Sequence, residues 1–191
     1  MNKIVLASHN ENKIREFRQI FSSKKIISLN DIGFEKEIEE TGFTLEENAL
    51  IKVREVFSFS HITSISDDSG LEIDFLDGEP GVLSARYSGL HARPIDNINR
   101  VLKKLGDTCM RKARFRTIIA FKDTKQEKLF EGIIDGRISK KIRGLGGFGY
   151  DPIFIPSQFD FTFSEMSSEL KNKISHRSLA IKKLHQFINS K

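Results

Sequence analysis

The stretch Ser66-Asp67-Asp68-Ser69-Gly70 places two adjacent carboxylates between two runs that alternate in polarity. Residues 62–65 and 71–75 each predict a short β-strand, so we expect a sharp break in the chain at the two acids. Neighbouring carboxylates repel each other, and keeping both ionised requires a cation or dense hydrogen bonding. An Asx-type turn capped by Ser69 is the alternative. These five residues alone leave both possibilities open.

Strand and helix patterns alternate on both sides of this stretch. Residues 3–7 predict a strand, and the helix after it is capped by Asn10 and has apolar residues at every third or fourth position. A second helix begins at Thr44, which forms a capping-box pattern with Glu47. Apolar periodicity predicts two further helices, over 95–105 and 180–188.

The middle of the chain predicts antiparallel strands. Residues 115–121 and 129–134 flank a polar turn at 123–126, which is the pattern of a β-hairpin. Mixed strand and helix order of this kind predicts an α/β fold with a long twisted mixed β-sheet flanked by helices. The 191 residues suffice for one hydrophobic core, so we expect a single domain over 1–191.

Composition narrows the class of protein without deciding its function. The net charge of +5 fits a nucleic acid or a small polyanionic substrate equally well. No apolar run approaches the roughly 18 residues that span a bilayer, and the N-terminal apolar stretch is too short for a signal peptide. The single cysteine, Cys109, excludes an internal disulfide framework and a multi-cysteine metal site. We therefore expect a cytoplasmic protein with no membrane association.

The loop between the first strand and the first helix is a candidate anion site. It reads Ser8-His9-Asn10-Glu11-Asn12-Lys13. Backbone N–H groups at a helix N-terminus together with a nearby lysine suit a phosphate group. The loop is not a Walker loop, because it lacks the glycines and the Gly-Lys-Ser/Thr ending. A capped helix with a surface lysine is the alternative.

A glycine-rich stretch, Gly144 to Gly149, is the second candidate site. It fits G-x-G-x-x-G, but two prolines in the following residues, 150–156, predict an extended run instead of the helix that a dinucleotide fingerprint opens. We therefore expect a loop that presents Phe148 and Asp151, whose ring could stack on a purine while the carboxylate reads an edge of the base. The alternative is that Phe148 belongs to the core.

Taken in order along the chain, seven motifs resemble those of the inosine triphosphatase family, and most of all its bacterial dITP/XTP pyrophosphatase branch. The motifs are Ser8-His9-Asn10-x-x-Lys13, Glu39-Glu40-Thr41-Gly42, Glu47-Asn48-Ala49-x-x-Lys52, Ser66-Asp67-Asp68-Ser69-Gly70-Leu71, Pro80-Gly81-x-x-Ser84-Ala85-Arg86-Tyr87, Gly146-Gly147-Phe148-Gly149-Tyr150-Asp151-Pro152 and Ser175-His176-Arg177. They cover nearly the whole chain. Two positions depart from the family pattern: His9 replaces a common glycine, and Leu170 replaces a common acidic residue.

The resemblance implies a homodimeric α/β enzyme that uses Mg²⁺. Such an enzyme hydrolyses non-standard purine nucleoside triphosphates (ITP, dITP and XTP) to the monophosphate and pyrophosphate, which keeps these nucleotides out of DNA and RNA. We therefore expect a small-molecule purine nucleotide as the partner, and neither a nucleic acid nor a membrane. Two alternatives are a nucleic-acid-binding module and a septum-inhibitor type pyrophosphatase. The motifs at 148–152 and 175–177 argue against the septum-inhibitor type.

The resemblance also implies a role for each matched residue. Asp68 would be the general base and a magnesium ligand, Glu39 would be the second acidic ligand, and Asp67 would support the turn or the metal's surroundings. The triphosphate would be bound by Ser8, His9, Asn10, Glu11, Asn12, Lys13, Lys52 and Ser69. The base would be recognised by Phe148, Gly149, Tyr150, Asp151, Lys171, His176 and Arg177.

Overall fold

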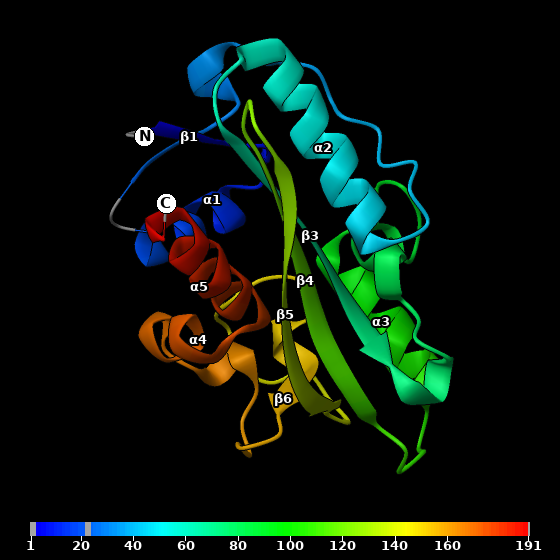
Figure 1. Ribbon diagram of the computed structural model, residues 1–191. Coiled ribbons are helices and arrows are strands. Elements are labelled where there is room, and N and C mark those ends of the chain that lie inside the picture. The colour runs from blue at the N-terminus through cyan, green and yellow to red at the C-terminus, as the bar shows by residue number, and fades with distance from the viewer. Residues whose placement is uncertain (1–2, 22–23, 191) are drawn as a thin grey trace. The chain divides into compact units, whose positions relative to one another are not determined.

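The computed structural model describes residues 3–21 and 24–190 (Figure 1). Within these residues the strands are β1 (Lys3–Leu6), β2 (Lys25–Ile27), β3 (Ser64–Ile73), β4 (Lys112–Lys122), β5 (Glu127–Ile138) and β6 (Phe154–Pro156). The α-helices are α1 (Glu11–Ile20), α2 (Leu45–Ser60), α3 (Pro94–Leu105), α4 (Ser168–Ile174) and α5 (His176–Asn189). None of the helices in the described residues is both long enough and apolar enough to cross a membrane.

The strands form one mixed sheet in the order β2-β1-β3-β4-β5-β6. Strand β1 pairs in parallel with β2 and with β3, whereas β5 pairs antiparallel with β6. Parallel neighbours need a crossover connection, and α1 and α2 provide the two crossovers here. The predicted α/β class with a mixed sheet flanked by helices is confirmed. Strands β4 and β5 are joined by residues 123–126, where the hairpin turn was predicted.

The chain groups into two compact units, each built from separate segments. The first contains Met1–Asp68, Thr117–Gly132 and Arg177–Lys191, and the second contains Ser69–Arg116 and Ile133–His176. Strands β3, β4 and β5 contribute residues to both units. Each unit has a hydrophobic core of its own. The single domain expected over 1–191 stays a prediction.

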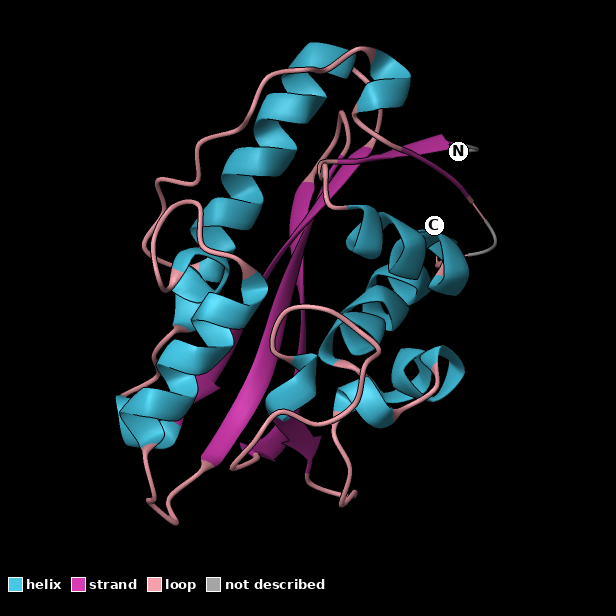
Figure 2. Ribbon diagram, turned by 180° about the vertical axis from the view of Figure 1, so that it is seen from behind, coloured by secondary structure: helices cyan, strands magenta, loops and turns pink. Residues whose placement is uncertain are grey.

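In the first unit, β1 is covered by helices on both faces. Ile4 and Leu6 belong to a buried cluster with residues of α1 and α5, whereas Val5 and Ala7 belong to another that includes Val56 of α2. Successive strand residues point to opposite faces, so a strand covered on both sides consists of apolar residues without alternation. Figures 1 and 2 show α2 on one side of β1 and α1 with α5 on the other.

In the second unit, α3 packs its apolar stripe against β3. Ile98 and Val101 of the helix and Leu71 and Ile73 of the strand share one buried cluster. Aromatic rings extend this cluster, which also contains Phe115, Phe154 and Phe163. The ring centroids of Phe115 and Phe154 lie 4.6 Å apart, and those of Phe154 and Phe163 lie 5.3 Å apart.

The predicted helix starts are confirmed where a capping residue was identified. The Asn10 side chain accepts hydrogen bonds from the N–H groups of Asn12 and Lys13 at the start of α1. Thr44 accepts one from the N–H group of Glu47 at the start of α2. Local capping chemistry therefore fixes where both helices begin.

The predicted chain break at the two acids is wrong, and so is the alternative of a turn there. Strand β3 runs from Ser64 to Ile73 without interruption. The glycine serves close packing instead of a turn, because a Cβ atom on Gly70 would lie 2.6 Å from the carbonyl oxygen of Gly81. Cations from other elements contact both side chains, so the two carboxylates are compensated within an extended strand.

Candidate active site

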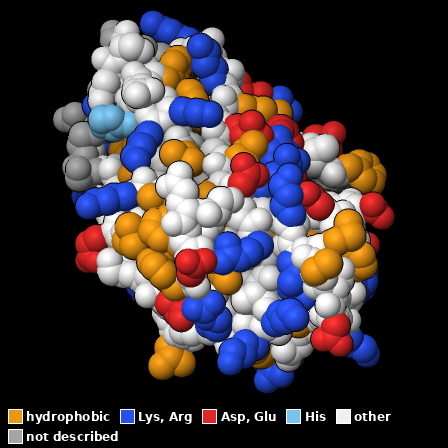
Figure 3. Space-filling view, turned by 90° about the horizontal axis from the view of Figure 1, so that it is seen from below, with side chains coloured by type: hydrophobic (Ala, Val, Ile, Leu, Met, Phe, Trp, Pro, Cys, Tyr) orange, Lys and Arg blue, Asp and Glu red, His pale blue; other side chains and the backbone are white. Residues whose placement is uncertain are grey.

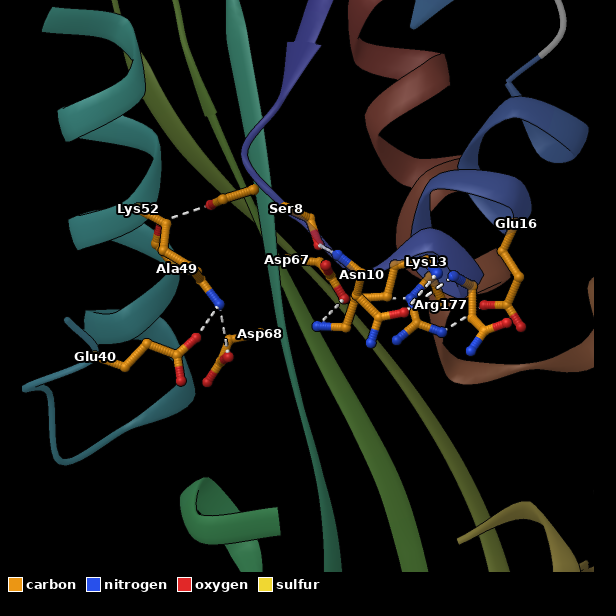
Figure 4. Close-up of polar contacts among 12 residues, drawn as sticks. Ser8, Asn10, Lys13, Glu16, Glu40, Ala49, Lys52, Asp67, Asp68 and Arg177 are labelled. Carbon is orange, nitrogen blue, oxygen red and sulfur yellow. Dashed lines mark hydrogen bonds and ion pairs between the residues drawn. The ribbon is translucent and has the colours of Figure 1, made fainter. Parts of the chain in front are cut away.

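Asp68 shares one lysine with a second carboxylate. The Lys52 ammonium of α2 donates to Asp68 Oδ1 at 2.8 Å and to Glu40 Oε1 at 2.6 Å (Figure 4). All three side chains belong to the first unit, and Lys52 and Asp68 are buried. A cation thus bridges two carboxylates in a largely dry environment, where its charge is weakly screened.

Burial and charge shift the pKa values of this group. Burial raises the pKa of Asp68, Glu40 adds to the rise, and Lys52 opposes it without cancelling it. Burial alone would lower the pKa of Lys52, but Asp68 and Glu40 raise it on balance. A carboxylate with a raised pKa is a better proton acceptor when ionised, so Asp68 has the character of a general base.

Asp67 lies in a different charge environment. Its Oδ2 atom is 3.1 Å from Lys13 Nζ and 3.2 Å from Arg177 Nε, and Arg177 also donates to Glu16 (Figure 4). Burial opposes ionisation, yet Lys13 and Arg177 hold the pKa of Asp67 well below its usual range. Against the effect of its own burial, Asp67 and Glu16 raise the pKa of Arg177. Asp67 is therefore held ionised and fixes two cations.

The alternation of a strand explains why the two acids differ. Adjacent residues of β3 point to opposite faces, so Asp67 and Asp68 contact different elements. Lys13 lies in the first turn of α1, and Arg177 lies near the start of α5. Lys52 lies on α2. Two carboxylates that are neighbours in sequence thus have different partners and opposite pKa shifts.

The loop before α1 shows one of the two features that the sequence left open. The capped helix is confirmed, and Ser8 Oγ also accepts a hydrogen bond from the Asn10 N–H at 3.1 Å. His9, Asn10 and Glu11 are exposed. Lys13 points to Asp67 and is only partly exposed. The phosphate-binding role of this loop, Asn12 included, stays a prediction.

In the second unit, Asp151 organises the glycine-rich loop. Its Oδ2 atom accepts from Lys171 Nζ at 2.7 Å and from the Phe148 N–H at 2.8 Å. The Lys171 ammonium lies 4.5 Å from the centroid of the Phe148 ring, which is half-buried and outside the buried core cluster. Gly147 has φ +72°, and a Cβ atom there would lie 2.2 Å from Asp151 Oδ2. The loop conformation therefore depends on this glycine.

Other predicted base-recognition residues are packed into the second unit. The Tyr150 hydroxyl donates to the carbonyl oxygen of Ser84 at 2.9 Å, and burial raises the pKa of Tyr150. The His176 ring stacks on Phe115, with centroids 4.6 Å apart and planes at 12°. Gly149 adopts φ +59°. Ser69, which was predicted to bind the triphosphate, is half-buried. Their proposed contacts with substrate stay predictions.

Three residues of these arrangements were not identified from the sequence. Glu16 follows Lys13 by three positions, which places both on one face of a helix and was a usable signal. Glu40 lies in the motif from which Glu39 was chosen, yet Glu40 is the acid that contacts Lys52, while Glu39 is exposed. Ser84, which binds Tyr150, lay in a recognised motif with no role assigned.

The carboxylates near Lys52 fit a divalent cation. Across residues 3–21 and 24–190, no three His, Cys, Asp or Glu side chains are placed to hold a metal ion. Magnesium in proteins is commonly held by one or two carboxylates, with substrate phosphates completing the shell. Asp68 and Glu40 already converge on one cationic group, the Lys52 ammonium. This pair therefore suits magnesium bound together with a phosphate.

A model of the Ham1 family matches residues 4–187, which is nearly the whole chain. The chain belongs to the Ham1 family. The dITP/XTP pyrophosphatase of Bacillus subtilis is 45% identical to this Ham1-family chain over 195 residues, covering 100% of the chain and 98% of the relative. A Staphylococcus aureus Ham1 protein structure superposes with a TM-score of 0.90 at 40% identity, covering 99% of both chains. A HAM1 protein structure from Coxiella burnetii superposes with a TM-score of 0.91 at 36% identity, covering 100% of both chains. The predicted family resemblance is confirmed.

The buried ion pairs of Asp67 predict a large loss of stability on its neutralisation. We expect Asp67→Asn to lower the free energy of unfolding at pH 7 by about 3–5 kcal/mol, because two cations lose their buried carboxylate. Urea denaturation measures this change. The matched control is Asp160→Asn, whose side chain is 99% exposed and pairs with Arg137. The control should change stability by less than about 1 kcal/mol.

The loss of stability in Asp67→Asn should depend on pH. The pKa of Asp67 is lower in the folded state than in the unfolded state, so its contribution to stability is present above the unfolded pKa of about 3.9 and is lost as the pH falls. The stability difference between wild type and Asp67→Asn should therefore narrow below about pH 4. A difference that stays constant from pH 7 to pH 3 would contradict the ionised state of Asp67.

Proposed function

We propose that this chain hydrolyses ITP, dITP and XTP to the nucleoside monophosphate and pyrophosphate, and so removes these nucleotides before they enter DNA or RNA. The observation that carries the proposal is the buried Asp68 carboxylate, with its raised pKa, beside Lys52 and Glu40. It occurs in a chain 45% identical to a dITP/XTP pyrophosphatase over its full length. The group combines a base, a metal-binding pair and a phosphate-binding cation.

Asp68 would act as the general base. It accepts a proton from a water molecule whose oxygen bonds to the α-phosphorus, while the bond from that phosphorus to the bridging oxygen of the β-phosphate breaks. Pyrophosphate leaves with the electron pair of that bond. Asp68 and Glu40 would hold a magnesium ion, which would supply charge neutralisation and lower the pKa of the attacking water. Glu39, the ligand that the family resemblance implies, is the exposed neighbour of Glu40 in the sequence.

Lysines of the first unit would bind the triphosphate. Lys13 and Lys52 neutralise Asp67 and Asp68 in this structure, and a triphosphate offers both ammonium groups further acceptors. Such cations stabilise the negative charge that develops on the leaving pyrophosphate. Further contacts are proposed from the exposed loop and from the residue after Asp68. These residues are Ser8, His9, Asn10, Glu11, Asn12 and Ser69.

The family resemblance implies that stacking and hydrogen-bond polarity both contribute to base recognition. The half-buried Phe148 ring suits stacking on a purine, next to the polar pair of Asp151 and Lys171. The Arg177 guanidinium can only donate hydrogen bonds, which suits a 6-keto oxygen and not the 6-amino group of adenine. Glu16 and Asp67 fix the orientation of that guanidinium. Gly149, Tyr150 and His176 would shape the surroundings of the base.

The family resemblance also supports a homodimer that acts in the cytoplasm on a small-molecule nucleotide, without a nucleic-acid partner. Size-exclusion chromatography with light scattering measures the oligomeric state. A monomer at micromolar concentration would contradict the dimer and leave the proposed chemistry untouched.

Release of pyrophosphate from a panel of nucleotides tests the reaction. With Mg²⁺, we expect turnover of ITP, dITP and XTP to exceed that of GTP and ATP. Asp68→Asn should lower kcat by about 10²–10⁴-fold, since the general base is lost while the volume of the side chain is kept. Nucleotide binding by calorimetry should persist in this variant. Asp160→Asn is the control, and unchanged turnover in Asp68→Asn would remove Asp68 from its role.

Adjacent glutamates provide a matched test of the metal site. We expect Glu40→Gln to raise the Mg²⁺ concentration for half-maximal activity at least about tenfold, because a ligand carboxylate becomes a neutral amide. Glu39→Gln should stay near wild type, since Glu39 is exposed. A metal titration of both variants decides between the two residues. The reverse pattern would assign the site to Glu39.

Arg177 should control the choice of base. Arg177→Ala should lower the ratio of kcat/KM for ITP to that for ATP by about 10- to 100-fold, which corresponds to one charged hydrogen bond. Arg137→Ala, which removes an arginine paired with exposed Asp160, controls for the loss of charge. An equal fall on both nucleotides would show instead that Arg177 serves phosphate binding.

A further inference from the structure

A groove of about 820 Å³ in the second unit has no part in the proposed function. Six of its twelve lining residues are basic, and none is acidic. The basic residues are Arg111, Lys112, Arg137, Lys140, Lys141 and Arg143. A concave surface lined by charges of one sign focuses the electric field and concentrates counter-ions. The groove is therefore suited to an anion.

Arg111 forms the fixed part of this surface. It is buried, and its guanidinium donates to the carbonyl oxygens of Ile138 at 2.8 Å, Ser139 at 2.9 Å and Gly106 at 3.0 Å. These contacts tie the residues before β4 to the end of β5. Burial lowers the pKa of Arg111, which is the expected effect of a positive charge held in a poorly solvated place. A nearby anion would stabilise that charge.

The cations at the rim differ in how far they are compensated. Arg137 pairs with Asp160 at 2.9 Å, and Arg143 pairs with Glu165 at 3.1 Å. Lys140 and Lys141 are exposed, and neither ammonium forms an ion pair with any residue that the structure describes. Two adjacent ammonium groups beside a buried guanidinium therefore remain available to a ligand.

The lining also indicates the chemical class of the ligand. No Phe, Tyr or Trp lines the groove, so it offers no surface on which a base could stack, as single-stranded nucleic acids require. Its volume lies in the range of small-molecule sites. Figure 3 shows one face of the molecule, on which many Lys and Arg side chains are exposed. The lining therefore fits a small anion that is bound through its charge better than it fits a nucleic acid.

We propose that this groove binds a short inorganic oligophosphate, such as pyrophosphate or tripolyphosphate, through the ammonium groups of Lys140 and Lys141, with the positive charge of the buried Arg111 behind them. Two or three linked phosphates place several negative charges within the span of one small groove. The proposal does not depend on the proposed hydrolysis, because none of the groove residues belongs to the predicted catalytic or substrate-binding set.

The sole cysteine provides a reporter for the groove. Cys109 is exposed and lies among the lining residues. Its thiolate can be titrated with 5,5′-dithiobis(2-nitrobenzoate), an anionic disulfide that releases one coloured thiolate as the mixed disulfide forms. We expect tripolyphosphate to slow this reaction saturably, and pyrophosphate to do so more weakly. The neutral reagent 4,4′-dithiodipyridine measures steric protection of the same thiol without charge repulsion.

Paired substitutions test the residues. Lys140→Ala with Lys141→Ala should weaken the protection by tripolyphosphate about tenfold, since two ammonium contacts are lost. Lys182→Ala with Lys183→Ala removes an adjacent exposed pair on α5 and should leave the protection unchanged. Turnover of ITP measured in parallel should be the same in both double variants. That readout separates this groove from the proposed active site, which also binds phosphates.

Three outcomes would overturn the proposal. The first is an absence of saturable protection by tripolyphosphate up to millimolar concentration. The second is equal weakening by the two lysine pairs, which would indicate a general effect of net charge. The third is protection by a single-stranded oligonucleotide at lower concentration than by tripolyphosphate, which would make the groove a nucleic-acid site. Failure here would leave the pyrophosphatase activity unaffected, and a failed activity assay would leave the binding result standing.

Discussion

The first unit depends on the burial of two adjacent carboxylates with separate sets of cations. Removing a carboxylate from water is costly unless charge and hydrogen bonds replace the lost hydration. Lys13 and Arg177 compensate the charge of Asp67, and Lys52 compensates the charge of Asp68. These cations come from α1, α5 and α2, so the charges on one strand fix three helices of the unit.

Helix α2 contacts β3 through two residues of one face. Thr44 caps α2, and within this helix Ala49 and Lys52 are three positions apart and therefore lie on the same face. The carbonyl oxygen of Ala49 accepts a hydrogen bond from Ser66 Oγ at 2.6 Å. Two residues further along β3, Asp68 accepts a hydrogen bond from Lys52. One face of α2 thus contacts both Ser66 and the proposed base, Asp68.

Local signals predicted most of the fold and only part of the site. The helices α1, α2 and α3 followed from caps and apolar spacing, and the hairpin followed from alternation around its turn. The break at Asp67 and Asp68 was wrong because strand preference depends on tertiary contacts: β3 pairs with β1, and the two acids contact cations distant in sequence. The contact of Arg177 with Asp67 spans 110 positions, so no local pattern predicts it. Glu40 could not be distinguished from Glu39 without knowing which carboxylate reaches Lys52.

The opposite pKa shifts of the two acids separate their roles more sharply than their positions do. Where the environment shifts the pKa values of two neighbouring titratable groups in opposite directions, one group usually has a structural or electrostatic role and the other transfers protons. Asp67, held ionised by two cations, is a poor proton acceptor but a strong anchor. Asp68, with one shared lysine and a second carboxylate nearby, binds a proton more readily. A phosphate that drew Lys52 away would leave Asp68 and Glu40 without their shared cation, and a bound magnesium ion would then replace it. In the proposed function, binding of the metal and binding of the triphosphate would therefore be coupled through Lys52.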